Sequence, residues 1–213
     1  MFFTALLLSS CKDEDKPVTP KKAVTEVTCI ENNLSKADDK QITLLIRKVL
    51  TWANSDDSFE LLPFNEGTDS LCTGINFRQH NENLNKLKET GYFTEVFISN
   101  YDNIVKTIDK QIKNKTIEPW NVYEEPPLRF DTGASAWCMC QDNSDWGKVE
   151  TEAIGIYDDE SEFYWKFGGL QPDDDPSWKA FRYKFKAAIK NGKWKIDWME
   201  GFDYESSTKS DGM

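Results

Sequence analysis

Apolar positions recur at helical spacing through the first half of the chain. Two stripes predict helices over residues 36–54 and 92–113. A short polar helix is predicted over 82–90, because the residue behind it is a glycine, which commonly ends helices. Residues 56–80 and 114–132 are punctuated by proline or glycine and are predicted to be irregular. The stripes are Ile42, Leu45, Ile46, Val49 and Ala53 in the first helix, and Phe93, Phe97, Tyr101, Ile104, Ile108 and Ile112 in the second.

The second half of the chain changes to the alternating period of β-strands. In residues 181–189, apolar side chains alternate with Arg and Lys, and residues 194–198 alternate Trp and Ile with Lys and Asp. An Asn-Gly pair separates these two segments, which is the strongest short signal for a hairpin. Three further strands are predicted over 134–140, 148–157 and 162–167. Helices followed by a meander predict an α+β fold, with the N-terminal helices packed on one face of a curved, cone-like antiparallel sheet.

Composition narrows the class of function. The chain has 213 residues and a formal net charge of −11, and 13% of its residues are aromatic, which argues against a disordered chain. The acidic balance argues against nucleic acid as a partner, since the phosphate backbone must be met by Lys and Arg. A single His, His80, excludes chemistries that need two, and its polar neighbours predict that it is exposed. We expect no metal ion and no cofactor.

The N-terminus has the pattern of an export signal. Residues 2–8 form an apolar run that is too short to span a bilayer but typical of the hydrophobic region of a signal peptide. Two serines and Cys11 follow, and Leu8-Ser9-Ser10-Cys11 resembles the lipobox of bacterial lipoproteins. By that resemblance, residues 1–10 are removed and Cys11 carries lipid, so that two or three acyl chains anchor the protein to a membrane.

The segment behind Cys11 predicts where the protein resides. Lys12-Asp13-Glu14-Asp15-Lys16 resembles the acidic export signal that some bacteria with two membranes place behind the lipidated Cys. We therefore expect an outer-membrane lipoprotein exposed on the cell surface, with the periplasmic face as the alternative. Residues 11–28 are predicted to form a flexible tether, residues 29–205 a single domain, and residues 206–213 a disordered tail.

The terminal hairpin carries a family resemblance. Helices ahead of a twisted meander, ending in Asn191-Gly192-Lys193-Trp194-Lys195-Ile196, resemble the nuclear-transport-factor-2-like superfamily with its cystatin-type cone. That superfamily includes enzymes and binding modules, so the fold alone assigns no function. The resemblance implies a pocket between helices and sheet, and the alternative is that large aromatic side chains simply fill the cone. The candidate lining residues are Trp52, Phe97, Tyr101, Trp165, Tyr183 and Trp198.

The remaining cysteines are disulfide candidates, because an exported protein meets oxidising conditions. They are Cys29, Cys72, Cys138 and Cys140. Cys138 and Cys140 fall on one face of a predicted strand, where a bond between them would be strained, so we expect Cys72 to pair with one of the two. A thiolate metal site is the weaker alternative. The acidic loops at 142–145 and 173–175 do not match the spacing of a calcium loop.

Basic residues concentrate around the last hairpin. Residues 176–196 carry seven Lys or Arg and no acidic residue. Since the aromatic face of these strands must be buried, the basic side chains are expected on the outer face of the sheet. There they form a candidate patch for an acidic partner, made of Arg182, Lys184, Lys186 and Lys195. The alternative is an outer face neutralised by acidic neighbours such as Glu150, Glu152 and Glu162.

These features favour a binding module over an enzyme. The inward faces of the clearest strands carry no Asp or Glu, with Glu200 beyond Trp198 as the one candidate exception, so no catalytic residue is assigned. The first hypothesis is a surface- or periplasm-facing lipoprotein that binds an unknown protein or glycan partner. The alternatives are a small isomerase or hydrolase that uses a buried carboxylate, an immunity-type inhibitor, and a glycan-binding protein. Glycan binding would need exposed rings side by side, for which the loop candidates are Trp120, Tyr123, Trp146 and Trp178.

Overall fold

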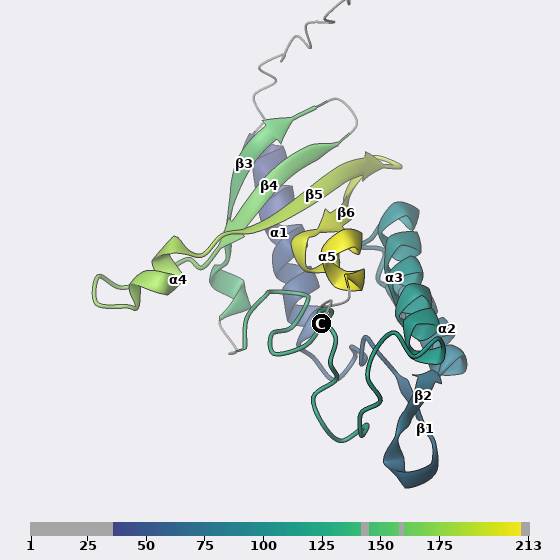
Figure 1. Ribbon diagram of the computed structural model, residues 1–213. Coiled ribbons are helices and arrows are strands. Elements are labelled where there is room, and N and C mark those ends of the chain that lie inside the picture. The colour runs from purple at the N-terminus through teal and green to yellow at the C-terminus, as the bar shows by residue number, and fades with distance from the viewer. Residues whose placement is uncertain (1–35, 142–144, 158–159, 210–213) are drawn as a thin grey trace, which may run out of the picture. The chain divides into compact units, whose positions relative to one another are not determined.

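Three of the described helices precede the main sheet, one short helix lies between two of its strands, and one follows it, so the fold is of the predicted α+β class (Figure 1). The computed structural model describes residues 36–141, 145–157 and 160–209. The expected signal peptide, lipidation site Cys11, tether and Cys29 lie outside the described residues. The helices are α1 (Lys36–Ala53), α2 (Phe77–Thr90), α3 (Glu95–Lys113), α4 (Pro176–Ala180) and α5 (Tyr204–Thr208), with 3-10 turns η1 (Thr68–Ser70), η2 (Trp146–Lys148) and η3 (Glu200–Phe202). The strands are β1 (Phe64–Glu66), β2 (Cys72–Ile75), β3 (Glu150–Ile156), β4 (Ser161–Lys166), β5 (Tyr183–Lys190) and β6 (Lys193–Met199).

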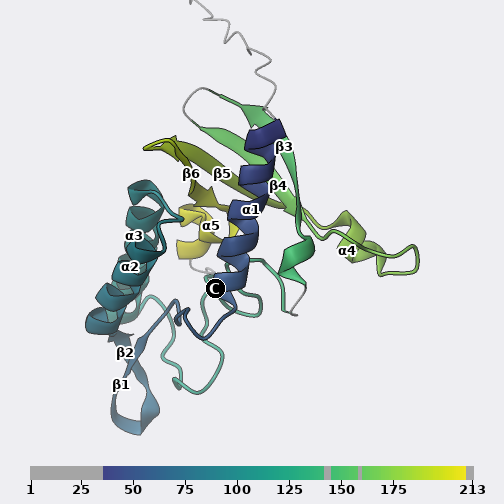
Figure 2. The ribbon, with the colours of Figure 1, turned by 180° about the vertical axis from the view of Figure 1, so that it is seen from behind.

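Helix α1 crosses one face of the main sheet (Figure 2). Its predicted stripe is buried, with Ile42, Ile46 and Val49 in the core. Two side chains from the same helix reach β3 and the residue before it. The Thr43 hydroxyl lies 2.6 Å from the Thr151 hydroxyl, and Arg47 Nε donates to the Val149 carbonyl oxygen at 2.8 Å.

Helix α3 follows its predicted stripe and packs beside β6. It begins at Glu95, where the Thr94 side chain accepts a hydrogen bond from Phe97 N. Residues 92–94 run alongside β6, since Ile196 N donates to the Tyr92 carbonyl and Thr94 N donates to the Ile196 carbonyl. This segment therefore covers the β6 edge of the main sheet.

Helix α2 is longer than predicted. It begins at Phe77 rather than at residue 82, because Asn76 caps it by accepting a hydrogen bond from Gln79 N. It ends as predicted, with Gly91 in the left-handed conformation (φ 68°). The segment expected to be irregular ahead of α2 contains a small hairpin of β1 and β2, and its strands of three and four residues are too short to show a period.

The main sheet is an antiparallel meander in the order β3-β4-β5-β6. All four of its strands lie within two residues of predicted segments, and the Asn191-Gly192 turn has positive φ at both residues (54° and 73°), as a tight hairpin requires. The helix-facing side chains of β4 and β5 are buried, among them Phe163, Trp165 and Phe185.

Strand β6 departs from strict alternation, which corrects the expected position of Trp198. Lys186 pairs with Trp198 but Ala187 pairs with Ile196, so Asp197 is an extra residue in β6. This bulge turns Trp198 to the outer face and buries Met199 in its place. Trp198 is therefore not a core residue.

Residues 134–140 are not the predicted strand. They form turns in which only Ser135 and Cys140 pair as a bridge, and Met139 adopts the left-handed conformation (φ 53°). Ala136, Trp137 and Cys138 are consecutive and all buried, which an alternating strand with one exposed face would not produce.

The C-terminal end of the domain also differs from the prediction. Phe202 in η3 is fully buried, and α5 continues to Thr208 with Ser207 buried. The expected tail therefore begins too early at 206, because the domain extends at least to Thr208.

Candidate functional site

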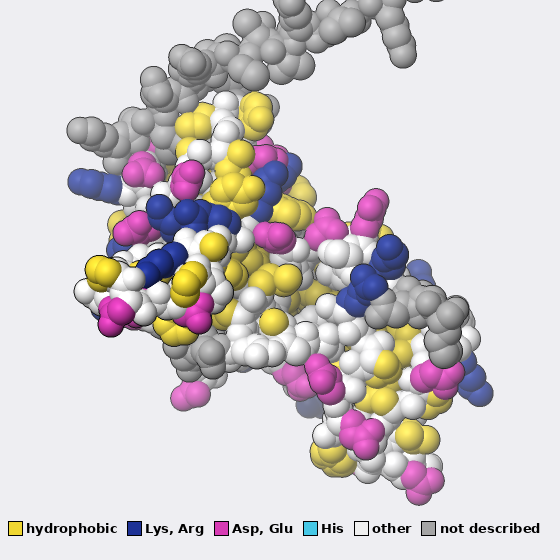
Figure 3. Space-filling model, turned by 60° about the vertical axis from the view of Figure 1, so that its left-hand side comes forward, with side chains coloured by type: hydrophobic (Ala, Val, Ile, Leu, Met, Phe, Trp, Pro, Cys, Tyr) yellow, Lys and Arg dark blue, Asp and Glu magenta, His cyan; other side chains and the backbone are white. Residues whose placement is uncertain are grey.

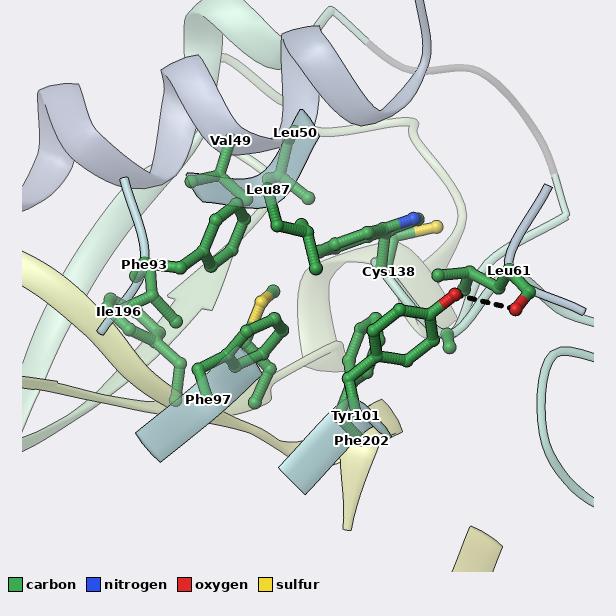
Figure 4. Close-up of a cluster of buried hydrophobic side chains, with 14 of the residues drawn as sticks. Val49, Leu50, Leu61, Leu87, Phe93, Phe97, Tyr101, Cys138, Ile196 and Phe202 are labelled. Carbon is green, nitrogen blue, oxygen red and sulfur yellow. Dashed lines mark hydrogen bonds between the residues drawn. The ribbon is translucent and has the colours of Figure 1, made fainter. Parts of the chain in front are cut away.

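Apart from Trp198, the aromatic residues expected to line a cone pocket pack in the core instead. Phe97, Tyr101, Trp165 and Tyr183 are buried, and Trp52 packs half-buried against the same cluster. Phe97 belongs to what we call the core cluster, which consists of Phe93, Phe97, Trp137 and Phe202, with ring centroids 4.6 to 6.2 Å apart (Figure 4). The geometry supports the interpretation that these rings fill the interior.

The hydroxyl groups of the buried Tyr101 and Tyr183 form hydrogen bonds with backbone groups. Tyr101 donates to the Leu61 carbonyl at 2.7 Å (Figure 4). Tyr183 donates to the Ala136 carbonyl and accepts from Gly201 N, both at 2.8 Å. Burial raises the pKa of both phenols, so they stay protonated. Neither hydroxyl is therefore placed to act on a substrate.

An open pocket of about 750 Å³ lies outside this core, beside α4. Four stretches that are distant in sequence line it: residues 132–141, η2 with Asp145, the loop after β4, and α4 with Phe181. Its apolar lining includes Met139, Phe167, Leu170, Trp178 and Phe181, and its polar lining includes Gln141, Asp145, Lys148 and Ser177. Sequence reasoning missed this pocket, because no single segment carries more than a few of its residues.

The aromatic wall of the pocket continues outward from the core. We call Trp165, Phe167, Phe181 and Trp178 the surface row. Trp165 is fully buried and lies 5.3 Å from Phe167, which lies 6.2 Å from Trp178 between ring centroids. Phe181 packs 5.0 Å from both Trp165 and Phe167. Trp178 ends the row with 48% of its surface exposed.

Local backbone features shape the pocket. Gly168 is required where the loop after β4 passes η2, because a β-carbon there would collide with the Lys148 carbonyl oxygen. Helix α4 is fixed at its start by Pro176 and by Asp175, which accepts from Ser177 N at 2.7 Å. Trp178 therefore stands on a defined turn of helix.

The disulfide prediction is partly wrong. Cys138 bonds to Cys140 across a Cα–Cα distance of 5.1 Å, and the left-handed Met139 between them makes this approach possible. Cys72 was expected to pair with one of them but keeps a buried, free thiol, and burial raises its pKa. Cys140 lines the pocket, so the disulfide loop forms part of its wall.

The candidate basic patch is largely neutralised on the outer face. Lys184 Nζ lies 2.8 Å from Glu162, and Lys186 Nζ lies 2.7 Å from Glu160 and 3.4 Å from Glu162. Arg182 lies 3.7 Å from Glu152. Lys195 also emerges on this face, paired in register with Ala188. In Figure 3, basic, acidic and hydrophobic side chains lie close together on this side of the molecule.

His80 is buried, contrary to the prediction that it is exposed. Its Nε2 lies 3.0 Å from Asp102 Oδ1, and its ring packs on Phe77 and Tyr101. Burial lowers the pKa of His80 although the Asp102 carboxylate opposes the shift. Burial would raise the pKa of Asp102, but hydrogen bonds from Lys106 and His80 lower it. The pair ties α2 to α3.

Two carboxyl groups, Asp131 and Glu60, have raised pKa values. Burial raises the pKa of Asp131 to about 6, with Glu60 adding to the shift and a hydrogen bond from Ala136 N opposing it. Burial likewise raises the pKa of Glu60. Asp131 accepts from Ala136 N at 2.9 Å and thereby holds the turn ahead of the disulfide. Neither group lines the pocket beside α4.

The acidic loops act as turn and helix caps where the structure describes them. Asp145 caps η2, Asp174 accepts from Gln171 N, and Asp175 caps α4. Residues 142–144 lie outside the described part of the chain. Within the described residues, no group of three or more His, Cys, Asp or Glu side chains could hold a metal ion.

Two of the four loop aromatics proposed for glycan binding are packed. Trp120 and Trp146 are buried, whereas Tyr123 is 78% exposed and Trp178 lines the pocket. Tyr123 donates to Glu66 of β1 at 3.1 Å, and β1 and α4 lie at separate ends of the domain in Figures 1 and 2. The pair that glycan binding was expected to use is therefore absent among these four, and Trp178 alone remains at a pocket.

Comparison with models of known protein families, with curated proteins and with solved structures found no match. Among the described helices, none has the length and apolar content needed to cross a membrane.

Proposed function

We propose that this protein is an outer-membrane lipoprotein, anchored through Cys11 and facing the outside of the cell, whose domain binds a ligand or partner without transforming it. The anchor is supported by the apolar run at 2–8, the lipobox-like Leu8-Ser9-Ser10-Cys11 and the acidic residues that follow. A cone of the nuclear-transport-factor-2-like type remains part of the proposal. It is supported by the order of helices and meander and by the Asn191-Gly192 hairpin.

The observation that carries the binding function is the pocket beside α4. Its volume of about 750 Å³ falls within the range of roughly 300–1,000 Å³ that is usual for small-molecule sites. Its lining combines aromatic side chains with a few polar ones, which is also typical of such sites.

The placement of titratable groups supports binding over catalysis. The pocket's own charged side chains, Asp145 and Lys148, lie 3.3 Å apart and neutralise each other. Asp131, the carboxyl group with the most strongly raised pKa, accepts a backbone hydrogen bond outside the pocket. The isomerase or hydrolase alternative would need such a group to face a ligand.

The anchor is tested with Cys11→Ser in the native cell. We expect the variant to move from the membrane to the soluble fraction with unchanged circular dichroism, because the described domain begins well behind residue 11. Recovery of the unmodified wild-type protein in the soluble fraction would contradict the anchor.

The binding function is tested with a variant that obstructs the pocket. Ser177 is exposed and lines the pocket, so Ser177→Trp should block binding of envelope components to the lipid-free Cys11→Ser chain. Lys179→Trp, on the same helix but outside the lining, is the matched control. Mass spectrometry of the released ligand should show it unchanged. A ligand that is released chemically altered, or that binds equally to the Ser177→Trp variant, would refute the proposal.

A further inference from the structure

The pocket beside α4 exposes a large aromatic ring to solvent. Trp178 keeps 48% of its surface exposed, on a helix that carries no other aromatic side chain. A tryptophan ring has a large apolar area, and its face carries partial negative charge. An exposed ring at the mouth of a pocket therefore offers a flat, electron-rich surface to a ligand.

The ring is also held in position before any ligand arrives. Phe167 packs against it at 6.2 Å, and Phe167 in turn packs on the fully buried Trp165 of β4. Capping by Asp175 fixes the helix that carries it. Because a fixed side chain loses little conformational freedom on binding, such a platform favours recognition by stacking.

The charged side chains of the pocket lining are paired with each other, which favours an uncharged ligand. Asp145 and Lys148 are the charged side chains among the lining residues that the structure describes, and they pair at 3.3 Å. Arg182, the basic residue just before β5, lies 3.7 Å from Glu152. Among the described lining residues, a charged ligand group would find no unpaired counter-charge, so desolvating it would cost free energy.

The remaining polar groups are of the kind that hydroxyl groups pair with. Gln141, Ser177 and the Asp145–Lys148 pair provide amide, hydroxyl, carboxylate and ammonium groups around the aromatic wall. These side chains are exposed to solvent, so a purely apolar ligand would displace water from them without offering hydrogen bonds in return. A pyranose ring has one face of weakly positive C–H groups and an edge of hydroxyl groups, and so matches both parts of the lining.

We infer that the pocket beside α4 binds a neutral sugar ring, stacked on Trp178 and hydrogen-bonded by the polar side chains opposite. The inference rests on the proposed binding function and names its ligand class. It replaces the pair of exposed rings expected from the sequence by a single ring with a polar rim.

The experiment probes the lipid-free Cys11→Ser chain with an array of neutral and anionic oligosaccharides, followed by calorimetry on the best-bound neutral one. We expect neutral sugars to bind, with affinity unchanged between about 50 and about 500 mM salt. Trp178→Ala should weaken binding at least about tenfold, whereas Trp178→Tyr, which keeps an aromatic face, should retain most of it. Tyr123→Ala, which removes an exposed ring far from the pocket, is the matched control.

The outcomes separate this inference from the function on which it rests. Absence of any bound neutral sugar, equal affinity in Trp178→Ala, or a strong salt dependence overturns the sugar assignment. If a peptide library instead yields ligands that Ser177→Trp blocks, the sugar assignment falls and the binding function stands. If sugars bind and neither Trp178→Ala nor Ser177→Trp affects them, the pocket is not the site and both proposals fail.

Discussion

Two groups of aromatic side chains in this protein have opposite environments. The core cluster lies under α1 and α3, and its rings pack against one another at ordinary contact distances. The surface row starts at the buried Trp165 of β4, leads to α4 and ends in the half-exposed Trp178. The comparison teaches that aromatic content alone does not locate a site, because the same residue types build the filled interior and the open pocket.

The comparison predicts that truncating a ring of the core cluster lowers the free energy of unfolding much more than truncating Trp178. Phe202→Ala should lower the free energy of unfolding by about 3–5 kcal/mol, since Phe202 is fully buried among four rings. Trp178→Ala should change it by less than about 1 kcal/mol, because half of that side chain already faces water. Urea unfolding measures both. Comparable losses in the two variants would mean that the surface row is structural.

A smaller effect is expected from the hydroxyl of Tyr183. Tyr183→Phe should cost about 2–3 kcal/mol, because it leaves the Ala136 carbonyl and Gly201 N without the partner they share in the interior. Tyr164→Phe, on the outer side of the sheet, is the control and should be nearly neutral. An equally small change for Tyr183→Phe would show that these backbone groups find other partners.

The carboxyl group of Asp131 gives a prediction that depends on pH. Its pKa in the folded state, about 6, lies above the value of roughly 3.9 in an unfolded chain, so the proton binds the folded state more tightly. The stability from this group is full below about pH 4 and is lost as the pH rises through about 6. Asp131→Asn should therefore stabilise the protein by about 1–2 kcal/mol at pH 7.5 and have little effect at pH 4.

A control variant separates the effect of charge at Asp131 from the effect of its left-handed backbone conformation. Asp131 has φ 57°, where Asn is also better tolerated than Asp, and the exposed Asp69 has a similar φ of 58°. Asp69→Asn should show only this backbone contribution, at every pH. If the stabilisation at Asp131 does not vary between pH 4 and pH 7.5, burial of the carboxylate is not its cause.

The smallest effect concerns the outer face of the sheet. A double-mutant cycle of Lys184→Met and Glu162→Gln should give a coupling energy of about 0.2–1 kcal/mol, because both side chains are partly exposed to solvent. A hydrogen bond from Lys184 lowers the pKa of Glu162, so this coupling is present at neutral pH and is lost as the pH falls through that lowered pKa. A coupling of several kcal/mol would contradict a merely solvated outer face.

Local periodicity explains what the sequence could predict of the fold. The stripes over 36–54 and 92–113 and the alternation in the last hairpin identified α1, α3, β5 and β6. The bulge at Asp197 could not be read from that alternation, because Trp198 and Met199 are both apolar and either could face inward. His80 was misplaced because its immediate neighbours are polar, although Asn83 and Leu87 on the same helix face are buried.

The site was harder to predict than the fold, for a geometric reason. Trp178 was one of four loop aromatics, and nothing local distinguishes it from Trp146, which is buried. The pocket forms only where the disulfide loop, η2 and α4 meet. That meeting depends on the left-handed Met139 and on Gly168, which are tertiary constraints.

The most direct test of the comparison follows all eight tryptophans at once. We propose ¹⁹F NMR of the Cys11→Ser chain labelled with 5-fluorotryptophan, with the Trp178 resonance assigned by Trp178→Phe, during titration with the neutral oligosaccharide bound best in the array. The expected result is a shift of the Trp178 signal while those of the buried Trp137 and Trp165 stay unchanged. Shifts at Trp137 or Trp165 with a stationary Trp178 would place the ligand in the core and contradict the site beside α4.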